Sequence, residues 1–303
     1  EPSGTDVEYD PAYQEMRRAA AGEPERRMGN SVIHAIEPNW ARVTSLAGDL
    51  LSRSKDLRVA ILLSQALLQT QGFPGLNQGL TLILGLLTKF WDGLYPRLEA
   101  EDDNDPTTRV NALLELCDRE AFLNPVRATP LIVSRAFGAI TLRDLEIAEG
   151  RTPAPARSDK PPLDLTTANA AFRDCADEDL HRTASAVSSA LENLRRIGIL
   201  VTEKIGASNS PDLAPLADLL TEANALLGKL LDDRSQVAEP ESGGPREQSD
   251  ETSPAPGSGR RATSAQAGGA INSREDVIGM LDRLCEYYAH NEPSSPVPLL
   301  LHR

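Results

Sequence analysis

The chain contains 303 residues, with a net charge of −14 at pH 7 and a sequence pI of about 4.8. This acidic balance argues against a nucleic-acid binder, which needs clustered Lys and Arg side chains to neutralise phosphates, and it favours basic partners. Aromatic residues make up only 4% of the chain, and Leu and Ala dominate its apolar residues. That composition argues against an all-β protein and predicts a mainly α fold.

The length of the chain is sufficient for two domains. Its longest apolar run, Leu80 to Leu87, is far shorter than the roughly 20 residues that cross a bilayer, so no direct membrane insertion is expected. The chain starts at Glu1 without an initiator Met and stops at Arg303, which indicates a trimmed piece of a longer protein. A signal peptide removed earlier stays an open alternative.

Residues 1–150 are predicted to form one compact helical domain. Asp10 and Pro11 are a typical helix start, and later apolar residues recur at helical spacing. The stretch Gln71 to Gly75 is rich in helix breakers and separates two apolar helices. The predicted helices run from Pro11 through Ala20, from Pro38 through Leu51, from Leu57 to Gln71, from Leu76 to Trp91, and from Pro106 through Cys117.

The end of this domain carries a different pattern. Residues 130–141 are rich in β-branched residues around Gly138, which predicts a small β-hairpin. Thr141 and Asp144 then have the spacing of a capping box at the start of a short helix.

Residues 151–164 contain several prolines and are expected to be a linker between domains. Residues 165–234 are predicted to form a helical hairpin, with one long helix from Glu178 to Ile205 and a second that begins at Pro211. A hairpin this thin has little interior of its own, so we expect it to form a dimer through these middle helices.

The last part of the chain changes character again. Residues 235–270 are low in large apolar residues and are expected to be a disordered tether. Residues 271–303 contain one predicted helix followed by an apolar, proline-rich tail, which is too short to support a core by itself. Two compatible interpretations stay open: a truncated domain, or a module that folds only by oligomerising into a ring.

Motifs that carry catalysis are missing from the sequence. It contains no phosphate-binding loop, nucleophile elbow, zinc-protease motif or dinucleotide-binding motif. The histidines lack a second type of ligand at metal-binding spacing, the acidic loop lacks the glycine and final glutamate of an EF-hand, and the cysteines form no CxxC pair. We therefore expect no catalytic residue, metal or cofactor, and a reducing compartment. The residues considered are His34, His181, His290 and His302, Asp102, Asp103 and Asp105, and Cys117, Cys175 and Cys285.

Two clusters could be either structural or functional. Lys55, Asp56 and Arg58 stand at the head of a predicted buried helix, where Asp56 can cap free N–H groups, whereas a catalytic lysine would need a desolvated pocket. Trp91 and Tyr95 stand where a helix ends, which favours core packing, with a partner-binding edge as the alternative.

Three blocks of the sequence resemble the TssA family of type VI secretion proteins. Residues 54–60 with 71–76, and residues 90–96 with 109–113, are similar to the family's ImpA N-terminal domain. Residues 273–301 resemble the start of its C-terminal module. The positions that carry the first two blocks are Lys55, Asp56, Arg58, Gly72, Gly75, Trp91, Tyr95, Pro96, Arg109 and Asn111. Those that carry the third are Tyr287, Glu292, Pro293, Pro296, Leu299 and Leu300.

The resemblance implies a non-enzymatic, cytoplasmic subunit of a bacterial type VI secretion system. Such a subunit would help to initiate or coordinate assembly of the sheath and tube at the baseplate, with baseplate, sheath and tube or spike proteins as partners. The resemblance also implies a homo-oligomeric ring built by the C-terminal module. This chain departs from the family by ending at Arg303, where further helix is expected.

Two other functions compete with this interpretation. A generic helical adaptor or chaperone would hold a partner helix in an apolar groove near Trp91, Tyr95 and Leu131. A hydrolase with an unrecognised site would need a deep pocket that contains carboxylates or histidines with perturbed pKa values.

Overall fold

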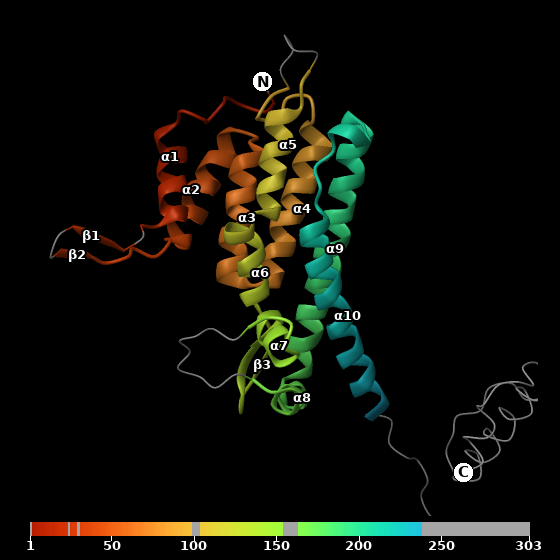
Figure 1. Ribbon diagram of the computed structural model, residues 1–303. Helices are drawn as coiled ribbons and strands as arrows, with labels where there is room; N and C mark the ends of the chain where they lie inside the picture. The colour runs from red at the N-terminus through yellow and green to blue at the C-terminus, as the bar shows by residue number, and fades with distance from the viewer. Residues whose placement is uncertain (1, 24, 29–30, 99–103, 154–162, 238–303) are drawn as a thin grey trace, which may run out of the picture. The chain divides into compact units, whose positions relative to one another are not determined.

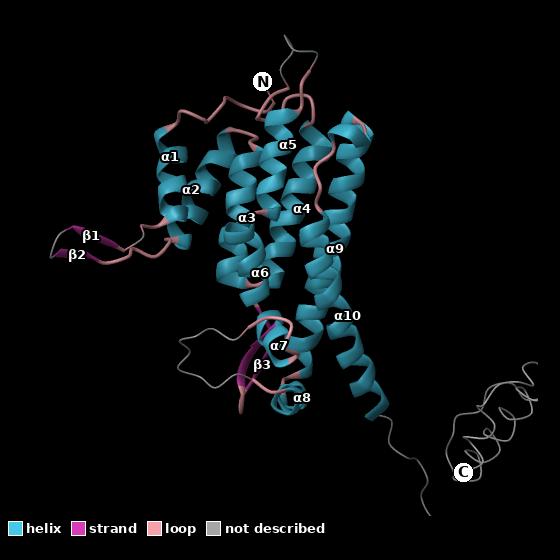
Figure 2. Ribbon diagram, viewed as in Figure 1, coloured by secondary structure: helices cyan, strands magenta, loops and turns pink. Residues whose placement is uncertain are grey.

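The computed structural model describes residues 2–23, 25–28, 31–98, 104–153 and 163–237 (Figure 1). Across these residues helices predominate, and strands form two short antiparallel pairs (Figure 2). The predicted mainly α class is therefore confirmed. The tail positions from Tyr287 to Leu300, the tether after Val237 and most of the predicted linker lie outside the described residues, so those expectations stay predictions.

The first four helices lie where the sequence pattern predicted them, but the expected start of the fourth at Leu76 is wrong by one turn, because Pro74 and Gly75 are part of its first turn. They are α1 (Pro11–Ala21), α2 (Trp40–Arg53), α3 (Leu57–Gln71) and α4 (Phe73–Phe90). The Asp10 carboxylate accepts a hydrogen bond from the Ala12 amide at 2.8 Å, as expected of a cap. Helix α2 begins two residues after Pro38, because the Asn39 side chain caps it instead.

A short β-hairpin, β1 (Arg26–Met28) with β2 (Ser31–Ile33), is inserted between α1 and α2. The sequence pattern did not predict this pair. Helices α1 and α2 pack on each other and on α3 through a small apolar cluster that includes Met16, Val43 and Leu50. They form a layer on one side of α3 (Figure 1).

Helices α3 and α4 approach each other closely because α4 contributes glycines to the contact. A Cβ atom on Gly75 would lie 2.1 Å from the Leu67 carbonyl oxygen, and one on Gly79 would lie 2.2 Å from Ser64 Oγ. Neither distance is compatible with a side chain, so the spacing of the two helices requires glycine at both positions.

After α4 the chain crosses back and forms a broken helical column. Its parts are α5 (Thr107–Leu114), the 3-10 turn η2 (Glu115–Cys117), the π-helical turn η3 (Arg119–Leu123) and α6 (Asn124–Ala128). The sequence predicted one helix that ends near Cys117. The continuation after the break starts where Asp118 accepts a hydrogen bond from the Ala121 amide at 2.6 Å.

The predicted hairpin is present as β3 (Pro130–Ser134) and β4 (Gly138–Thr141). It leads directly into α7 (Leu142–Ala148), where Thr141 and Asp144 form the expected capping box. The turn of the hairpin is fixed from outside, because Asp174 accepts hydrogen bonds from Ser134 Oγ at 2.6 Å and from the Ala136 amide at 3.1 Å.

The remaining helices are α8 (Leu165–Asp174), α9 (Asp177–Ile205), the 3-10 turn η4 (Ala207–Asn209) and α10 (Ala214–Val237). The expected start of the last helix at Pro211 is wrong by one turn, because Asp212 caps the Ala214 amide at 3.0 Å. Helix α10 also continues past residue 234, so the tether cannot begin at residue 235 as expected.

Helix α9 lies along α4, and this contact corrects the expected separation of residues 1–150 from residues 165–234 (Figure 1). One hydrophobic core contains Leu80 and Leu87 of α4 together with Leu191 of α9 and Leu220 of α10. The pair α9–α10 therefore has an interior after all, supplied by α4. Its apolar face is covered within the chain, which removes the physical reason for expecting a dimer through these helices.

Candidate functional site

Seven of the family-motif positions meet at one end of the α3–α4 pair, although they come from segments far apart in the sequence. Lys55, Asp56 and Arg58 stand at the start of α3, the loop that follows α4 carries Trp91, Tyr95 and Pro96, and Arg109 comes from α5. We call this region the motif end. Gly72, Gly75 and Asn111 lie outside it.

Arg109 is the centre of the motif end. Its side chain is only 1% exposed, and its guanidinium donates to the backbone oxygens of Trp91 at 2.9 Å, Leu94 at 2.7 Å and Pro96 at 2.9 Å. It also lies 4.7 Å from the centre of the Trp91 ring. Burial lowers the pKa of Arg109 to about 10, which still leaves the group charged at neutral pH.

Asp56 and Arg58 form a second buried ionic group. Asp56 is fully buried, caps the Arg58 amide at 2.9 Å and accepts from the Arg58 guanidinium at 2.7 Å. Arg58 also binds Asp6 at 2.9 Å and Glu8 at 3.0 Å, which fastens the N-terminal segment to α3. Burial by itself would lower the pKa of Arg58, but the hydrogen bond and charge of Asp56 outweigh it and raise that pKa.

The backbone joins these groups into one unit. The Leu57 amide donates to the Tyr95 oxygen at 2.8 Å, and the Tyr95 amide donates to the Lys55 oxygen at 2.9 Å. The Tyr95–Pro96 peptide bond is cis. The Lys55 amide donates to the Ser3 oxygen at 2.7 Å, so the N-terminal segment closes over the same place.

The aromatic side chains of the motif end are covered. Trp91 is 8% exposed and Tyr95 is 7% exposed, so neither ring lines an open apolar groove, contrary to the expectation for a partner helix. Leu131 is also fully buried, but it belongs to β3 and lies outside the motif end. Lys55 Nζ donates a hydrogen bond to the Leu51 carbonyl oxygen at 2.7 Å, so its ammonium group has a partner within the chain. The arrangement holds three chain segments together, while the buried Ser54 Oγ beside it has no hydrogen-bond partner among the described residues.

Groups with catalytic potential are scattered in the described part of the chain. His34 and His181 are exposed, and within the described ranges no cluster of His, Cys, Asp or Glu side chains is placed to hold a metal ion. Burial raises the pKa values of the Cys117 and Cys175 thiols, so neither is an activated nucleophile. None of the helices in those ranges is long and apolar enough to cross a membrane.

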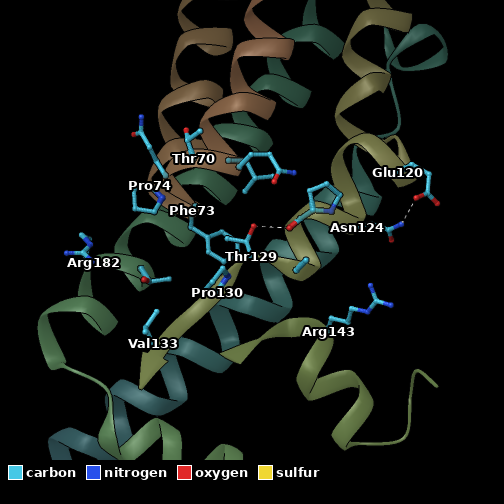
Figure 3. A pocket seen from close by; sticks show the side chains of 17 residues that line it. Thr70, Phe73, Pro74, Glu120, Asn124, Thr129, Pro130, Val133, Arg143 and Arg182 are labelled. Atoms are coloured by element: carbon cyan, nitrogen blue, oxygen red, sulfur yellow. Dashed lines mark hydrogen bonds between the residues drawn. The ribbon is translucent and has the colours of Figure 1, made fainter. Parts of the chain in front are cut away.

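The opposite end of the α3–α4 pair is open. A groove of about 760 Å³ surrounds the turn that joins the two helices and extends over α6, β3 and the first turns of α9 (Figure 3). We call it the α3–α4 groove. Gly72, a motif position with a φ of +66°, lies in its wall. The sequence marked this place only as a break between helices, because the other walls come from segments more than 40 residues away.

Some polar side chains around the α3–α4 groove have hydrogen-bond or ion-pair partners, and one does not. Thr129 Oγ1 donates to the Pro125 oxygen at 2.8 Å, and the Asn124 amide donates to Glu120 at 3.0 Å. Arg182 pairs with Asp179 at 2.5 Å on the surface. Arg143 is exposed and has no hydrogen-bond or ion-pair partner among the described residues.

A second, smaller cleft of about 470 Å³ lies between α1, α3 and the η2 turn. Tyr9, Tyr13, Arg17 and Glu115 contribute to its walls. Burial raises the pKa of Glu115, and the positive charge of Arg17 opposes that shift. Positive and negative groups are balanced in this cleft, so it has no clear charge preference.

Comparisons with known proteins agree with one another. The family described as ImpA, N-terminal, type VI secretion system, matches residues 1–118. The type VI secretion system component TssA1 of Pseudomonas aeruginosa is 43% identical over 303 residues, which is 100% of this chain and 86% of that protein.

A solved structure extends the similarity to the fold. The N-terminal domain of TssA from Burkholderia cenocepacia, which includes the conserved ImpA_N region, has a TM-score of 0.61 and 25% identity. The match covers 77% of this chain and 89% of that domain. Since residues 1–150 are about half of the 303 residues, the shared fold extends into the later helices, in agreement with the continuous core.

The motif end carries seven of the ten positions that resemble the ImpA N-terminal region, the matching family model covers residues 1–118, and the identity to TssA1 spans the whole chain. The chain therefore belongs to the TssA family of type VI secretion system components.

Proposed function

We propose that the chain acts as a non-enzymatic assembly subunit that helps to initiate or coordinate sheath and tube assembly at the baseplate of a type VI secretion system. The observation that carries this proposal is the 43% identity to TssA1 along the entire chain. The family resemblance supplies the assembly role, and with it a cytoplasmic place of action.

The contacts of the charged side chains support the proposed role as a scaffold. The buried Arg109 and the partly buried Arg58 bind backbone oxygens and carboxylates of their own chain, so they stabilise the fold. In the described part of the chain every buried side-chain polar group except Ser54 Oγ has a hydrogen-bond partner, which suits a protein that connects large partners. The net charge of −14 favours contacts with basic surfaces of those partners.

We propose baseplate, sheath and tube or spike proteins as partners, and a homo-oligomer as the working form. Because the α9–α10 pair is covered within the chain, we assign oligomerisation to residues 271–303 in preference to the middle helices. The family-motif residues of the motif end contribute indirectly, since they fix the shape of the body that meets the partners.

Deletion of the gene in its bacterial host tests the assembly role. We expect loss of fluorescent sheath structures and loss of the tube protein from the culture medium, with both restored by the wild-type chain. Unchanged sheath assembly and secretion in the deletion strain would contradict the proposal.

The oligomer is tested separately by measuring the mass of the purified chain with and without residues 270–303. A fall in mass on truncation places self-association in the tail. If the truncated chain is still a dimer, self-association is assigned to the middle helices instead. If the full-length chain is a monomer, the proposal of a homo-oligomer is contradicted.

A further inference from the structure

The α3–α4 groove combines exposed apolar surface with a rigid wall. In β3, Val133 is 56% exposed while its neighbour Ile132 is 4% exposed. Phe137, in the turn of the same hairpin, is 45% exposed but lies outside the groove wall. Apolar side chains left uncovered at the edge of a concave surface are typical of binding sites for other molecules.

Three prolines stiffen the groove. Pro74 is in the first turn of α4, Pro125 belongs to α6 and Pro130 begins β3, and all three contribute to the wall. Proline fixes φ and carries no N–H group, so these positions offer apolar contact without a hydrogen-bond donor that would need a partner. A wall that is already rigid lowers the entropy lost when a ligand binds.

The charges of the groove are mainly positive, in a chain whose net charge is −14. Arg182 of α9 and Arg143 of α7 lie on opposite sides of Pro130 (Figure 3). Arg143 lacks a described partner, and Arg182 has only the exposed ion pair with Asp179. The one carboxylate in the wall, Glu120, already accepts from the Asn124 amide. The groove therefore complements a ligand that carries carboxylates.

We propose that the α3–α4 groove binds a short, extended, acidic segment of a partner protein. Apolar side chains of that segment pack on Val133 and the prolines, and its carboxylates pair with Arg143 and Arg182. A basic segment is disfavoured by both guanidinium groups, and two separated cations are too few for a nucleic acid. This binding activity is independent of the proposed assembly role.

The probe for this proposal is a phage-displayed library of short random peptides, selected on the purified full-length chain. We expect enriched peptides in which Asp or Glu alternates with Leu, Val or Ile. The best of them is then synthesised with a fluorophore, and its affinity is measured by anisotropy. A second peptide with Lys in place of each acidic residue serves as the ligand control.

Matched double variants locate the binding site. Arg143→Ala with Arg182→Ala removes two positive charges from the groove, whereas Arg195→Ala with Arg196→Ala removes two from an exposed part of α9 outside it. Loss of two partly exposed ion pairs is expected to weaken peptide binding roughly tenfold, while the α9 control stays near the wild type. Circular dichroism checks that both variants fold.

A third variant tests the apolar part. Val133→Asp places a carboxylate on the groove wall at an exposed position, so it should fold and still reduce binding of the acidic peptide. The proposal is overturned if no peptide is enriched, if the enriched peptides are basic, or if the groove and control variants bind the acidic peptide equally well.

Discussion

The two ends of the α3–α4 pair use the same residue type in opposite ways. At the motif end Arg109 is buried and donates to three backbone oxygens, whereas at the α3–α4 groove Arg143 is exposed and has no described partner. The motif end can therefore change only at a large cost in stability. The groove can change its side chains with little effect on the fold, which leaves it available for binding.

This difference teaches where to look for function in a scaffold protein. Most residues that carry the sequence motif stabilise the fold. Asp56 caps α3, and the backbone of Tyr95 is hydrogen-bonded to the start of α3. The open surface lies at the other end, where the motif contributes chiefly Gly72. A motif can thus identify a family through its shape-determining residues while the partner surface lies elsewhere.

The strongest test of this contrast is Arg109→Ala. The substitution leaves the oxygens of Trp91, Leu94 and Pro96 buried without their donor and creates a cavity, so we expect a loss of about 4 kcal/mol in the free energy of unfolding. Urea denaturation followed by circular dichroism measures it. Arg119→Ala, at an exposed position, is the control and should stay within about 0.5 kcal/mol of the wild type.

The next largest effect is expected for Asp56→Ala. It removes the cap of α3 and leaves the Arg58 guanidinium without its buried partner, which should cost about 3 kcal/mol in the same assay. Asp49→Ala, an exposed acidic position on α2, should be close to neutral. Equal stability of the two variants would mean that the motif end is not held by this ion pair.

Substitutions at two glycines of α4 distinguish the effect of close helix packing on stability from the effect of helix propensity. A Cβ on Gly75 would lie 2.1 Å from the Leu67 oxygen, so Gly75→Ala should force α3 and α4 apart and cost about 2 kcal/mol. Gly85 has nothing within 4 Å of its added Cβ. Gly85→Ala should instead stabilise the same helix by about 0.5 to 1 kcal/mol, because alanine is the better helix former. If both variants shift in the same direction, the close approach is not required.

A smaller effect concerns the turn between β3 and β4. The hydrogen bond from Ser134 is the main reason that the pKa of Asp174 lies below its ordinary value of 3.8. Because the folded pKa is lowered, this anchor stabilises the fold above about pH 4 and is lost as the pH falls through the folded pKa. Ser134→Ala should raise the pKa of Asp174, which NMR titration of its carboxyl carbon can measure. An unchanged pKa would show that the backbone amides alone hold the carboxylate.

The smallest effect is expected for Arg143→Ala. No described contact is lost, so its free energy of unfolding should stay within about 0.5 kcal/mol of the wild type. Arg143→Ala and Arg109→Ala should be measured in the same urea series. The difference between their free energies of unfolding then compares the α3–α4 groove with the motif end. A large loss of stability would contradict the view that the groove end is free to change.

The local features were largely predictable from the sequence. The bounds of α3 agree with the expected helix from Leu57 to Gln71, and the capping box at Thr141 and the hairpin around Gly138 are present. The π-helical turn after Asp118 and the β1–β2 pair were not predicted, because they lack a periodic apolar pattern.

The candidate sites were predictable only in part. Structural roles for Asp56 and Trp91 follow from their places at helix ends, and the structure uses both in that way. The α3–α4 groove could not be found from the sequence, since its walls come from α3, α6, β3, α7 and α9. No spacing between such distant segments carries information about a shared surface.

The sequence by itself determined the helical class, the caps, the hairpin and the family, because each depends on neighbouring residues or on short blocks of motif. Only the tertiary structure decided that α9 lies on α4, that Arg109 is buried and that Arg143 is not. The physical reason is that burial and partnership depend on which distant surfaces meet. Periodicity shows that a helix has an apolar face, but the partner of that face is set by packing of the whole body.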